Sequence, residues 1–190
     1  MLIVSDYAGW ADKIAGESFN EDNGVFKIVR YDPLGVCAGI VSWNATFLYV
    51  GWKCAPALAA GNTVSSFSCK VSIRTNIAML QFIFKTSEKS PFGAAALGSL
   101  FKEAGFPPGV IQFITGATET GSLIASHMNI AKVSFTGSVG AGKAVQTAAT
   151  KSNLKLVTLE LGGKSPAIVF DDAPFELAVG RYDSPCLFPT

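Results

Sequence analysis

From Gly35 onward the sequence alternates apolar runs that are typical of buried strands with stretches that are typical of helices. This rhythm predicts right-handed βαβ units and a mostly parallel sheet with flanking helices, which is an α/β fold. The expected strands end near residues 41, 64, 114, 135 and 159. Because open parallel sheets bind ligands at the carboxyl ends of their strands, the residues that follow these positions are the first candidates for a site.

Local signals set the expected boundaries of the helices and strands. Gly61 and Asn62 form a helix stop, and Ser90 with Pro91 forms a helix start. The signals predict helices over residues 47–62, from 90 to a Gly-Phe-Pro-Pro stop, and over 118–128 and 141–152. Strands are predicted over residues 35–43, 110–115, 131–137, 154–163 and 166–170, with a further strand beginning in 63–67.

The chain is expected to hold one main domain, residues 35–179. Residues 1–34 are more polar and contain a turn-rich stretch at 16–24, which indicates a hairpin or a connector leading into that domain. We interpret residues 65–82 as an atypical insertion and residues 180–190 as a tail, both translated from non-coding sequence or a faulty gene model.

Composition and charge exclude several classes of protein. With 49% hydrophobic and 15% charged residues, the chain is expected to be ordered, and its net charge of +1 offers no electrostatic footprint for nucleic acid or an acidic membrane. A small neutral or anionic ligand fits better. The beginning of the chain has no basic leader, and no apolar run approaches membrane-spanning length, so we expect a soluble, cytoplasmic protein.

Cysteine and histidine are sparse and do not suggest a metal. The four cysteines show neither a C-x-x-C pair nor a nearby histidine set, which argues against a zinc site and a redox pair. The only histidine, His127, is interpreted as a helix-end or surface residue. By residue type alone, the aromatic residues Trp43, Trp52 and Phe135 are expected to be core residues without a chemical role.

A glycine-rich segment at residues 133–145 leads into an expected helix, and its sequence does not identify one ligand. Gly137, Gly142 and Lys143 match the pattern G-x-x-x-x-G-K-[ST] of loops that bind nucleoside triphosphates, but Ala144 lacks the hydroxyl that would bind magnesium. The dinucleotide pattern G-x-G-x-x-G is not matched either, because the glycines stand at 137, 140 and 142. Free backbone amides at a helix start attract any anion, so the turn alone does not name the ligand.

Five motifs at the expected strand ends occur in a characteristic order: SWNAT at 42–46, KTSEKSP at 85–91, TGATETG at 115–121, FTGSVGAGK at 135–143 and LELGGKSP at 159–166. In this order they resemble the aldehyde dehydrogenase superfamily, from about Tyr7 to about Val179, and LELGGKSP is the most specific of them. The resemblance implies a Rossmann-like domain that binds NAD. It also implies oxidation of an aldehyde to a carboxylic acid through a thioacyl enzyme.

The resemblance also implies roles for individual residues. Glu160 is similar to the family's general base, and Asn44 to its oxyanion donor. Lys85 and Glu88 resemble the pair that binds the adenosine ribose, where a glutamate favours NAD over NADP. The remaining cofactor contacts implied by the resemblance are at the pyrophosphate, the adenine and the nicotinamide, and they fall on Val41, Ser42, Trp43, Gly116, Gly137, Ser138, Leu161 and Gly162.

The sequence departs from the family pattern where the nucleophilic cysteine is expected. The neighbours of Cys186 supply neither the expected turn nor a helix start, so we expect no nucleophile there and little activity of this chain alone. The segment through which the family forms homo-oligomers is also expected to be absent. Two alternatives stay open: a non-catalytic dinucleotide-binding or interaction fragment, and a P-loop phosphotransferase.

Overall fold

The computed structural model describes residues 2–62 and 81–164, together with 166, 168, 170–174 and 176. Its elements follow one another as α1 (Leu2–Trp10), β1 (Glu17–Asp22), β2 (Val25–Val29), β3 (Cys37–Ile40), α2 (Thr46–Tyr49), the π-helical turn η1 (Val50–Cys54), α3 (Ala55–Ala57), the π-helical turn η2 (Leu58–Asn62), β4 (Phe82–Ser87), α5 (Pro91–Glu103), β5 (Ile111–Gly116), α6 (Thr118–Ser126), β6 (Lys132–Gly137), α7 (Val139–Lys151) and β7 (Leu156–Leu161).

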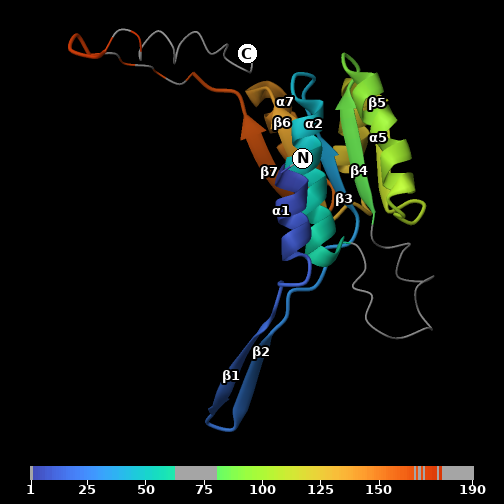
Figure 1. Ribbon diagram of the computed structural model, residues 1–190. Coiled ribbons are helices and arrows are strands. Elements are labelled where there is room, and N and C mark those ends of the chain that lie inside the picture. The colour runs from blue at the N-terminus through green and yellow to red at the C-terminus, as the bar shows by residue number, and fades with distance from the viewer. Residues whose placement is uncertain are drawn as a thin grey trace.

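A parallel sheet with the strand order β5-β4-β3-β6-β7 forms the centre of the molecule (Figure 1). All of its strand pairs are parallel, which confirms the α/β, Rossmann-like fold expected from the sequence. β4 and β6 lie on the two sides of β3, so the chain changes its direction of travel across the sheet at β3. Such a switch point opens a crevice at the carboxyl ends of the strands, where open α/β sheets bind ligands.

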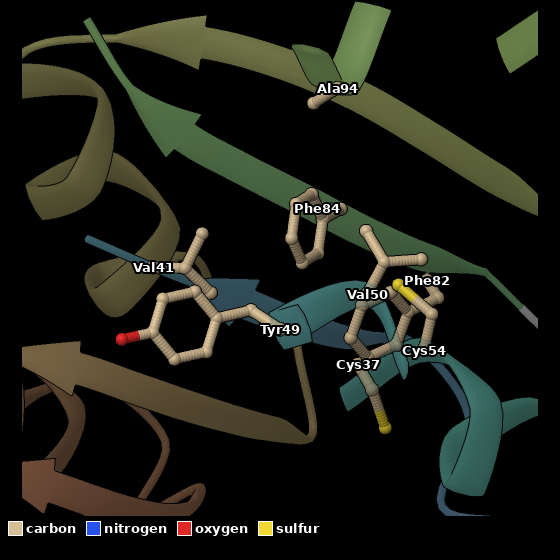
Figure 2. Packing of buried hydrophobic residues seen from close by; sticks show 8 residues of the cluster. All are labelled: Cys37, Val41, Tyr49, Val50, Cys54, Phe82, Phe84 and Ala94. Atoms are coloured by element: carbon tan, nitrogen blue, oxygen red, sulfur yellow. The ribbon is translucent and has the colours of Figure 1, made fainter. Parts of the chain in front are cut away.

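The central strand β3 is buried along its whole length, as expected for a strand covered by helices on both faces. On one face, Cys37 and Val41 pack with residues of the helical segment 46–62, β4 and α5 (Figure 2). On the other face, Ala38 and Ile40 pack with α6, α7 and β6. The two hydrophobic clusters therefore hold helices on both faces of the sheet.

The expected elements are largely present. β3, β5, β6 and β7 and the helices α5, α6 and α7 confirm the corresponding predictions. The strand expected to begin in 63–67 lies outside the described residues. Pro166, Ile168 and Phe170, the described residues of the strand expected over 166–170, are not in a strand. Phe82, the last residue of the expected insertion, is the first residue of β4.

Residues 46–62 form one continuous helical segment, in which α2 and α3 alternate with η1 and η2. The helix predicted over 47–62 is confirmed, but its π-helical turns were not predicted. Pro56 lies inside the segment and has no N–H to donate, so regular α-helical bonding is interrupted around it. The segment packs against β3 and β4, and α1 packs on its outer side, where Ile3 lies close to Gly51.

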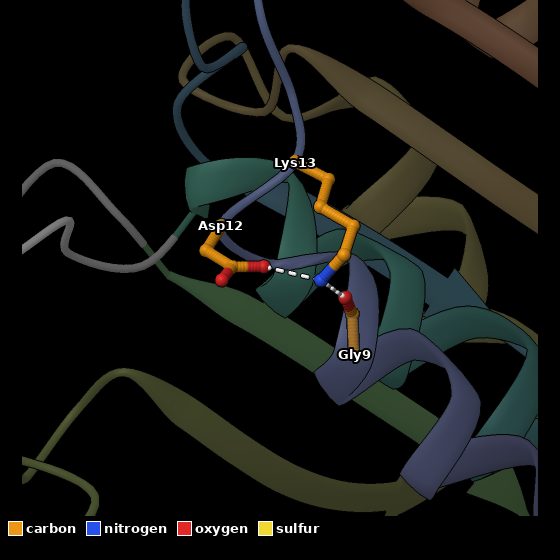
Figure 3. A network of polar contacts seen from close by, with 3 residues as sticks. All are labelled: Gly9, Asp12 and Lys13. Carbon is orange, nitrogen blue, oxygen red and sulfur yellow. Dashed lines mark hydrogen bonds and ion pairs between the residues drawn. The ribbon is translucent and has the colours of Figure 1, made fainter.

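β1 and β2 form an antiparallel hairpin within residues 1–34, where a hairpin or a connector was expected, and this hairpin extends away from the sheet (Figure 1). The preceding helix α1 was not predicted. After α1, Lys13 bonds the carboxylate of Asp12 at 2.7 Å and also the carbonyl of Gly9 (Figure 3). The hydrogen bond from Lys13 lowers the pKa of Asp12. Both side chains are exposed, so this contact adds little to stability.

Thr86 carries a testable prediction about the core. Thr86 is completely buried in β4, and its Oγ1 has no hydrogen-bond partner among the described residues. An unpaired buried hydroxyl costs about 1–3 kcal/mol, and valine has almost the same shape and suits a strand. Thr86→Val should therefore raise the free energy of unfolding in urea by about 1–3 kcal/mol. Thr150→Val on the exposed face of α7 is the control and should bring no gain; a loss of stability in Thr86→Val would contradict the prediction.

Candidate functional site

The carboxyl ends of β3, β4, β6 and β7 bring the expected site residues to one edge of the sheet. Ile40 of β3 is in register with Lys85 of β4 and with Phe135 of β6. Farther along, Thr136 is in register with Glu160 of β7. The chain therefore places the ends of four strands side by side, with Ser42 to Asn44 directly after the central one.

A cavity of about 2160 Å³ covers this edge of the sheet and extends to the amino ends of three strands, at Cys37, Phe82 and Lys132. All the expected site residues except Gly116 line it: Val41, Ser42, Trp43, Asn44, Lys85, Glu88, Gly137, Ser138, Glu160, Leu161 and Gly162. A Cβ at Gly116 would collide with the side chain of Thr120 in α6. The close approach of α6 therefore accounts for a glycine at position 116, and Gly116 does not line the cavity.

Lys85 is the most unusual charge in the cavity wall. It is 6% exposed, and its ammonium group forms neither a hydrogen bond nor an ion pair with any other described residue. Burial lowers its pKa, and the nearby carboxylate of Glu88 partly offsets this effect. Glu88 is exposed; its pKa is lowered first by a hydrogen bond from its own backbone N–H and less strongly by Lys85. Lys85 and Glu88 thus offer a donor and an acceptor to a ligand.

The start of α7 faces the same cavity. Ser138 is the N-cap of α7, and its Oγ accepts a hydrogen bond from the N–H of Ala141 at 3.3 Å. The Ser138 hydroxyl proton and the first N–H groups of the helix can still donate to an anion. Gly142 and Lys143 lie inside α7, and Lys143 is exposed on its surface. The P-loop interpretation is therefore wrong, because these residues are not part of a phosphate-binding loop.

Asn44 lies just beyond β3 in a cluster of hydroxyl groups. Its Oδ1 is 2.8 Å from Oγ of Ser42 and 3.4 Å from the phenol oxygen of Tyr49. Its Nδ2 forms no hydrogen bond with any other described residue. An amide with an occupied oxygen and an available NH₂ group can donate to a carbonyl oxygen in the cavity.

Glu160 and Lys53 lie on the same face of the sheet, over β6 and β7. Lys53 of η1 is 8% exposed, and its Nζ donates to Oγ of Ser134 in β6 at 2.7 Å. Because side chains alternate along a strand, Ser134 and Thr136 share a face, and Thr136 is in register with Glu160. Sequence reasoning missed Lys53; the only signal for it is one charge within the apolar helical stretch 50–60.

The buried charge of Lys53 makes stability depend on pH. Burial lowers its pKa from 10.5, while Glu160 partly offsets the shift. Between the lowered pKa and 10.5, the unfolded chain holds the proton that the folded chain has lost, so the free energy of unfolding rises with pH. Lys53→Met should flatten this rise and stabilise the protein at neutral pH. Urea denaturation against pH measures both effects, and the exposed Lys143→Met is the control; an unchanged slope in Lys53→Met would contradict the prediction.

The described cysteines are unsuited to nucleophilic attack. Cys37 and Cys54 are buried in the hydrophobic cluster beside β3, and burial raises the pKa of both thiols (Figure 2). A raised pKa leaves little of the reactive thiolate. Cys186 lies outside the described residues. Within the described part of the chain, no three acidic, histidine or cysteine side chains come together in the manner of a metal site.

The aromatic residues behave differently from the expectation. Phe135 is 5% exposed and confirms its assignment to the core. Trp43 and Trp52 are about half exposed, so their assignment to the core was wrong. Both rings line the cavity, where Trp52 also meets the ring of Tyr49 edge to face. His127, as predicted, is exposed at the end of α6.

Comparison with known proteins agrees with the motifs at the strand ends. The model of the aldehyde dehydrogenase family matches residues 1–183. The chain belongs to the aldehyde dehydrogenase family. Retinal dehydrogenase 2 of Homo sapiens is 48% identical over 174 residues, which are 91% of this chain and 30% of that protein. Aldehyde dehydrogenase, cytosolic 1, of Mus musculus is also 48% identical over 174 residues, 91% of this chain and 31% of that protein. This member of the aldehyde dehydrogenase family thus spans about a third of the length of these relatives.

Solved structures of aldehyde dehydrogenases share the fold of the chain. The crystal structure of PnpE, from Pseudomonas sp. WBC-3, in complex with nicotinamide adenine dinucleotide has a TM-score of 0.79 at 38% identity, covering 92% of this chain and 32% of PnpE. A point mutant of betaine aldehyde dehydrogenase from Staphylococcus aureus, in complex with NAD⁺, has a TM-score of 0.80 at 36% identity, covering 94% of this chain and 32% of that one. No helix in the described part of this aldehyde dehydrogenase chain has the length and apolar character needed to cross a bilayer.

Proposed function

We propose that this chain forms the dinucleotide-binding part of an NAD-dependent aldehyde dehydrogenase that oxidises an aldehyde to a carboxylic acid through a thioacyl enzyme. One observation carries the proposal: Lys85 is 6% exposed, lines the cavity and pairs with no other described residue. An ammonium group at a cavity wall that has no protein partner is available to donate hydrogen bonds to a ligand. Its position at the strand ends supports a role in holding the polar groups of a ligand.

The residues around the cavity fit an NAD molecule. Lys85 would donate a hydrogen bond to a hydroxyl of the adenosine ribose, and Glu88 would accept a hydrogen bond from a hydroxyl of the same sugar. The start of α7 with Ser138 would hold the pyrophosphate, because unpaired N–H groups at a helix start favour negative charge. The carboxylate of Glu88 would repel a 2′-phosphate, so the site favours NAD over NADP.

When bound, NAD accepts the hydride that leaves the carbon of the substrate. Asn44 would donate its free NH₂ group to the aldehyde oxygen as that oxygen gains negative charge. Glu160 would accept a proton from the water that hydrolyses the thioacyl enzyme. The buried side chain of Lys53 also lines the cavity, on the same face of the sheet as Glu160. The attacking thiol is neither Cys37 nor Cys54, because burial raises the pKa of both.

The substrate, the assembly and the cellular location are part of the same proposal. The substrate is a small-molecule aldehyde, in agreement with the names of the curated relatives. The whole protein would form homo-oligomers, as the family does. The similarity to a cytosolic aldehyde dehydrogenase of Mus musculus supports a cytoplasmic location.

Titration of the chain with NAD by calorimetry tests the proposal. Lys85→Ala should weaken binding about 10–100-fold, because a hydrogen bond from a charged group contributes about 1.5–3 kcal/mol. NADP should bind more weakly than NAD to the wild-type chain. Replacing Glu88 with glutamine should reduce this difference, because it removes the charge that repels the 2′-phosphate.

The exposed Lys102 of α5, which does not line the cavity, provides a matched control for charge. Lys102→Ala removes a positive charge away from the cavity and should leave the affinity for NAD almost unchanged. Equal losses of affinity in the Lys85 and Lys102 variants would mean that only the net charge of the chain matters. Absence of NAD binding by the folded wild-type chain would overturn the proposal.

A further inference from the structure

Ser42, Asn44 and Tyr49 form a closed triangle of hydrogen-bonding groups at the carboxyl end of β3. Oγ of Ser42 is 2.8 Å from Oδ1 of Asn44 and 3.0 Å from the phenol oxygen of Tyr49, which is itself 3.4 Å from the same Oδ1. We infer that Ser42 and Tyr49 are positioning residues that hold the Asn44 amide with its NH₂ group turned away from them and available to the aldehyde oxygen. This inference rests on the proposed function, in which Asn44 is the oxyanion donor.

The hydroxyl groups of Ser42 and Tyr49 can each donate one hydrogen bond, so only two of the three contacts in the triangle can be hydrogen bonds at one time. Ser42 can donate to Oδ1 of Asn44 or to the phenol oxygen of Tyr49, and Tyr49 can donate to Oδ1. In either arrangement, Oδ1 of Asn44 accepts at least one hydrogen bond from a hydroxyl group. The oxygen of the amide is therefore held by the cluster, and its nitrogen is not used there.

The reversed amide is disfavoured for the same reason. With Nδ2 of Asn44 facing the cluster, both hydroxyl oxygens would accept hydrogen bonds from the amide. The Ser42 proton could still reach the phenol oxygen, but the Tyr49 proton would then have no acceptor among the described residues. An unpaired buried donor costs about 1–3 kcal/mol, which is enough to keep the amide almost entirely in one orientation.

Both positioning residues are themselves held firmly. Tyr49 is 6% exposed and belongs to the hydrophobic cluster beside β3 (Figure 2). Its ring also meets that of Trp52 at a centroid distance of 6.2 Å. Its backbone N–H donates to the carbonyl of Ala45 at 3.0 Å. Ser42 follows Val41, whose N–H donates to the carbonyl of Lys85 in β4 at 3.1 Å. A donor oriented before the substrate arrives needs no reorganisation during the reaction.

Nuclear magnetic resonance of the ¹⁵N-labelled chain tests the orientation without requiring activity. The side-chain amide signals of Asn44, assigned by their loss in Asn44→Ala, should show no Overhauser contact with the Tyr49 ring protons next to the hydroxyl. They should shift in Ser42→Ala and in Tyr49→Phe, which keeps the buried ring. Thr46→Val removes a neighbouring buried hydroxyl that bonds Ser90, so it is the matched control and should not shift them. An Overhauser contact between the NH₂ group and these ring protons, or unchanged signals in both variants, would overturn the inference.

Kinetics of the whole native protein test the catalytic consequence. Tyr49→Phe should lower kcat about 10-fold, less than the loss expected when the donor itself is removed, and should leave KM for NAD unchanged. In an Asn44→Ala background, Tyr49→Phe should lower kcat no further, because the group that it positions is absent. An equal loss in both backgrounds would overturn the positioning role. If the wild-type chain binds no NAD, the proposed function fails, and the amide signals still decide the orientation.

Discussion

Asn44→Ala is expected to lower kcat for aldehyde oxidation about 10²–10³-fold in the whole native protein, because it removes a preorganised donor to the developing oxyanion. The amide is held at Oδ1 by Ser42 and Tyr49, so its NH₂ group is the part that the substrate would meet. Affinity for NAD should change little, since Asn44 is expected to contact the substrate. Steady-state kinetics with separate variation of aldehyde and NAD distinguish the two effects.

Asn129 offers a matched control for this substitution. It is an exposed asparagine in the turn before β6 and does not line the cavity. Asn129→Ala should leave kcat unchanged. If Asn44→Ala and Asn129→Ala had similar kcat values, Asn44 would be a turn residue without a catalytic role.

Phe84→Ala should cause the largest loss of stability, about 3–5 kcal/mol, as expected when a fully buried aromatic side chain leaves a cavity. Phe84 is 0% exposed in β4 and belongs to the hydrophobic cluster beside β3 (Figure 2). Its ring meets that of Phe113 at a centroid distance of 5.8 Å. β4 also carries Lys85 one residue farther along, so this loss should weaken NAD binding as well. Urea denaturation followed by circular dichroism measures the free energy of unfolding.

Phe92 is the corresponding surface residue. It is 84% exposed on α5, and Phe92→Ala should change the free energy of unfolding by no more than about 0.5 kcal/mol. Similar effects of the two substitutions would contradict the placement of Phe84 at the centre of the hydrophobic cluster.

Much of the fold could be predicted because it is encoded locally. The apolar runs of β3, β5 and β6 and the start of α5 at Ser90 and Pro91 are visible in short windows of the sequence. The π-helical turns around Pro56 and the helix α1 were missed, since neither has a distinctive local signal. α1 has no acidic residue in its first turn and no basic residue in its last.

The candidate site was predictable where motifs stand at strand ends, and unpredictable where distant segments meet. Glu160 and Asn44 could be found from their motifs, and both line the cavity. Lys53 could not, because its contact with Ser134 joins residues 81 positions apart. The exposure of Trp43 and Trp52 also depends on which segments cover them, and a single sequence does not show this.

An NAD titration of the ¹⁵N-labelled chain followed by nuclear magnetic resonance tests most directly whether the strand ends hold the dinucleotide. Backbone signals should shift at the carboxyl ends of the strands and the start of α7, namely at Lys85, Glu88, Gly137, Ser138 and Gly162. Signals at the amino ends of strands of the same sheet, near Ile111 of β5 and Leu156 of β7, should stay in place. Shifts confined to the amino ends, or no shifts at saturating NAD, would contradict NAD binding at this edge of the sheet.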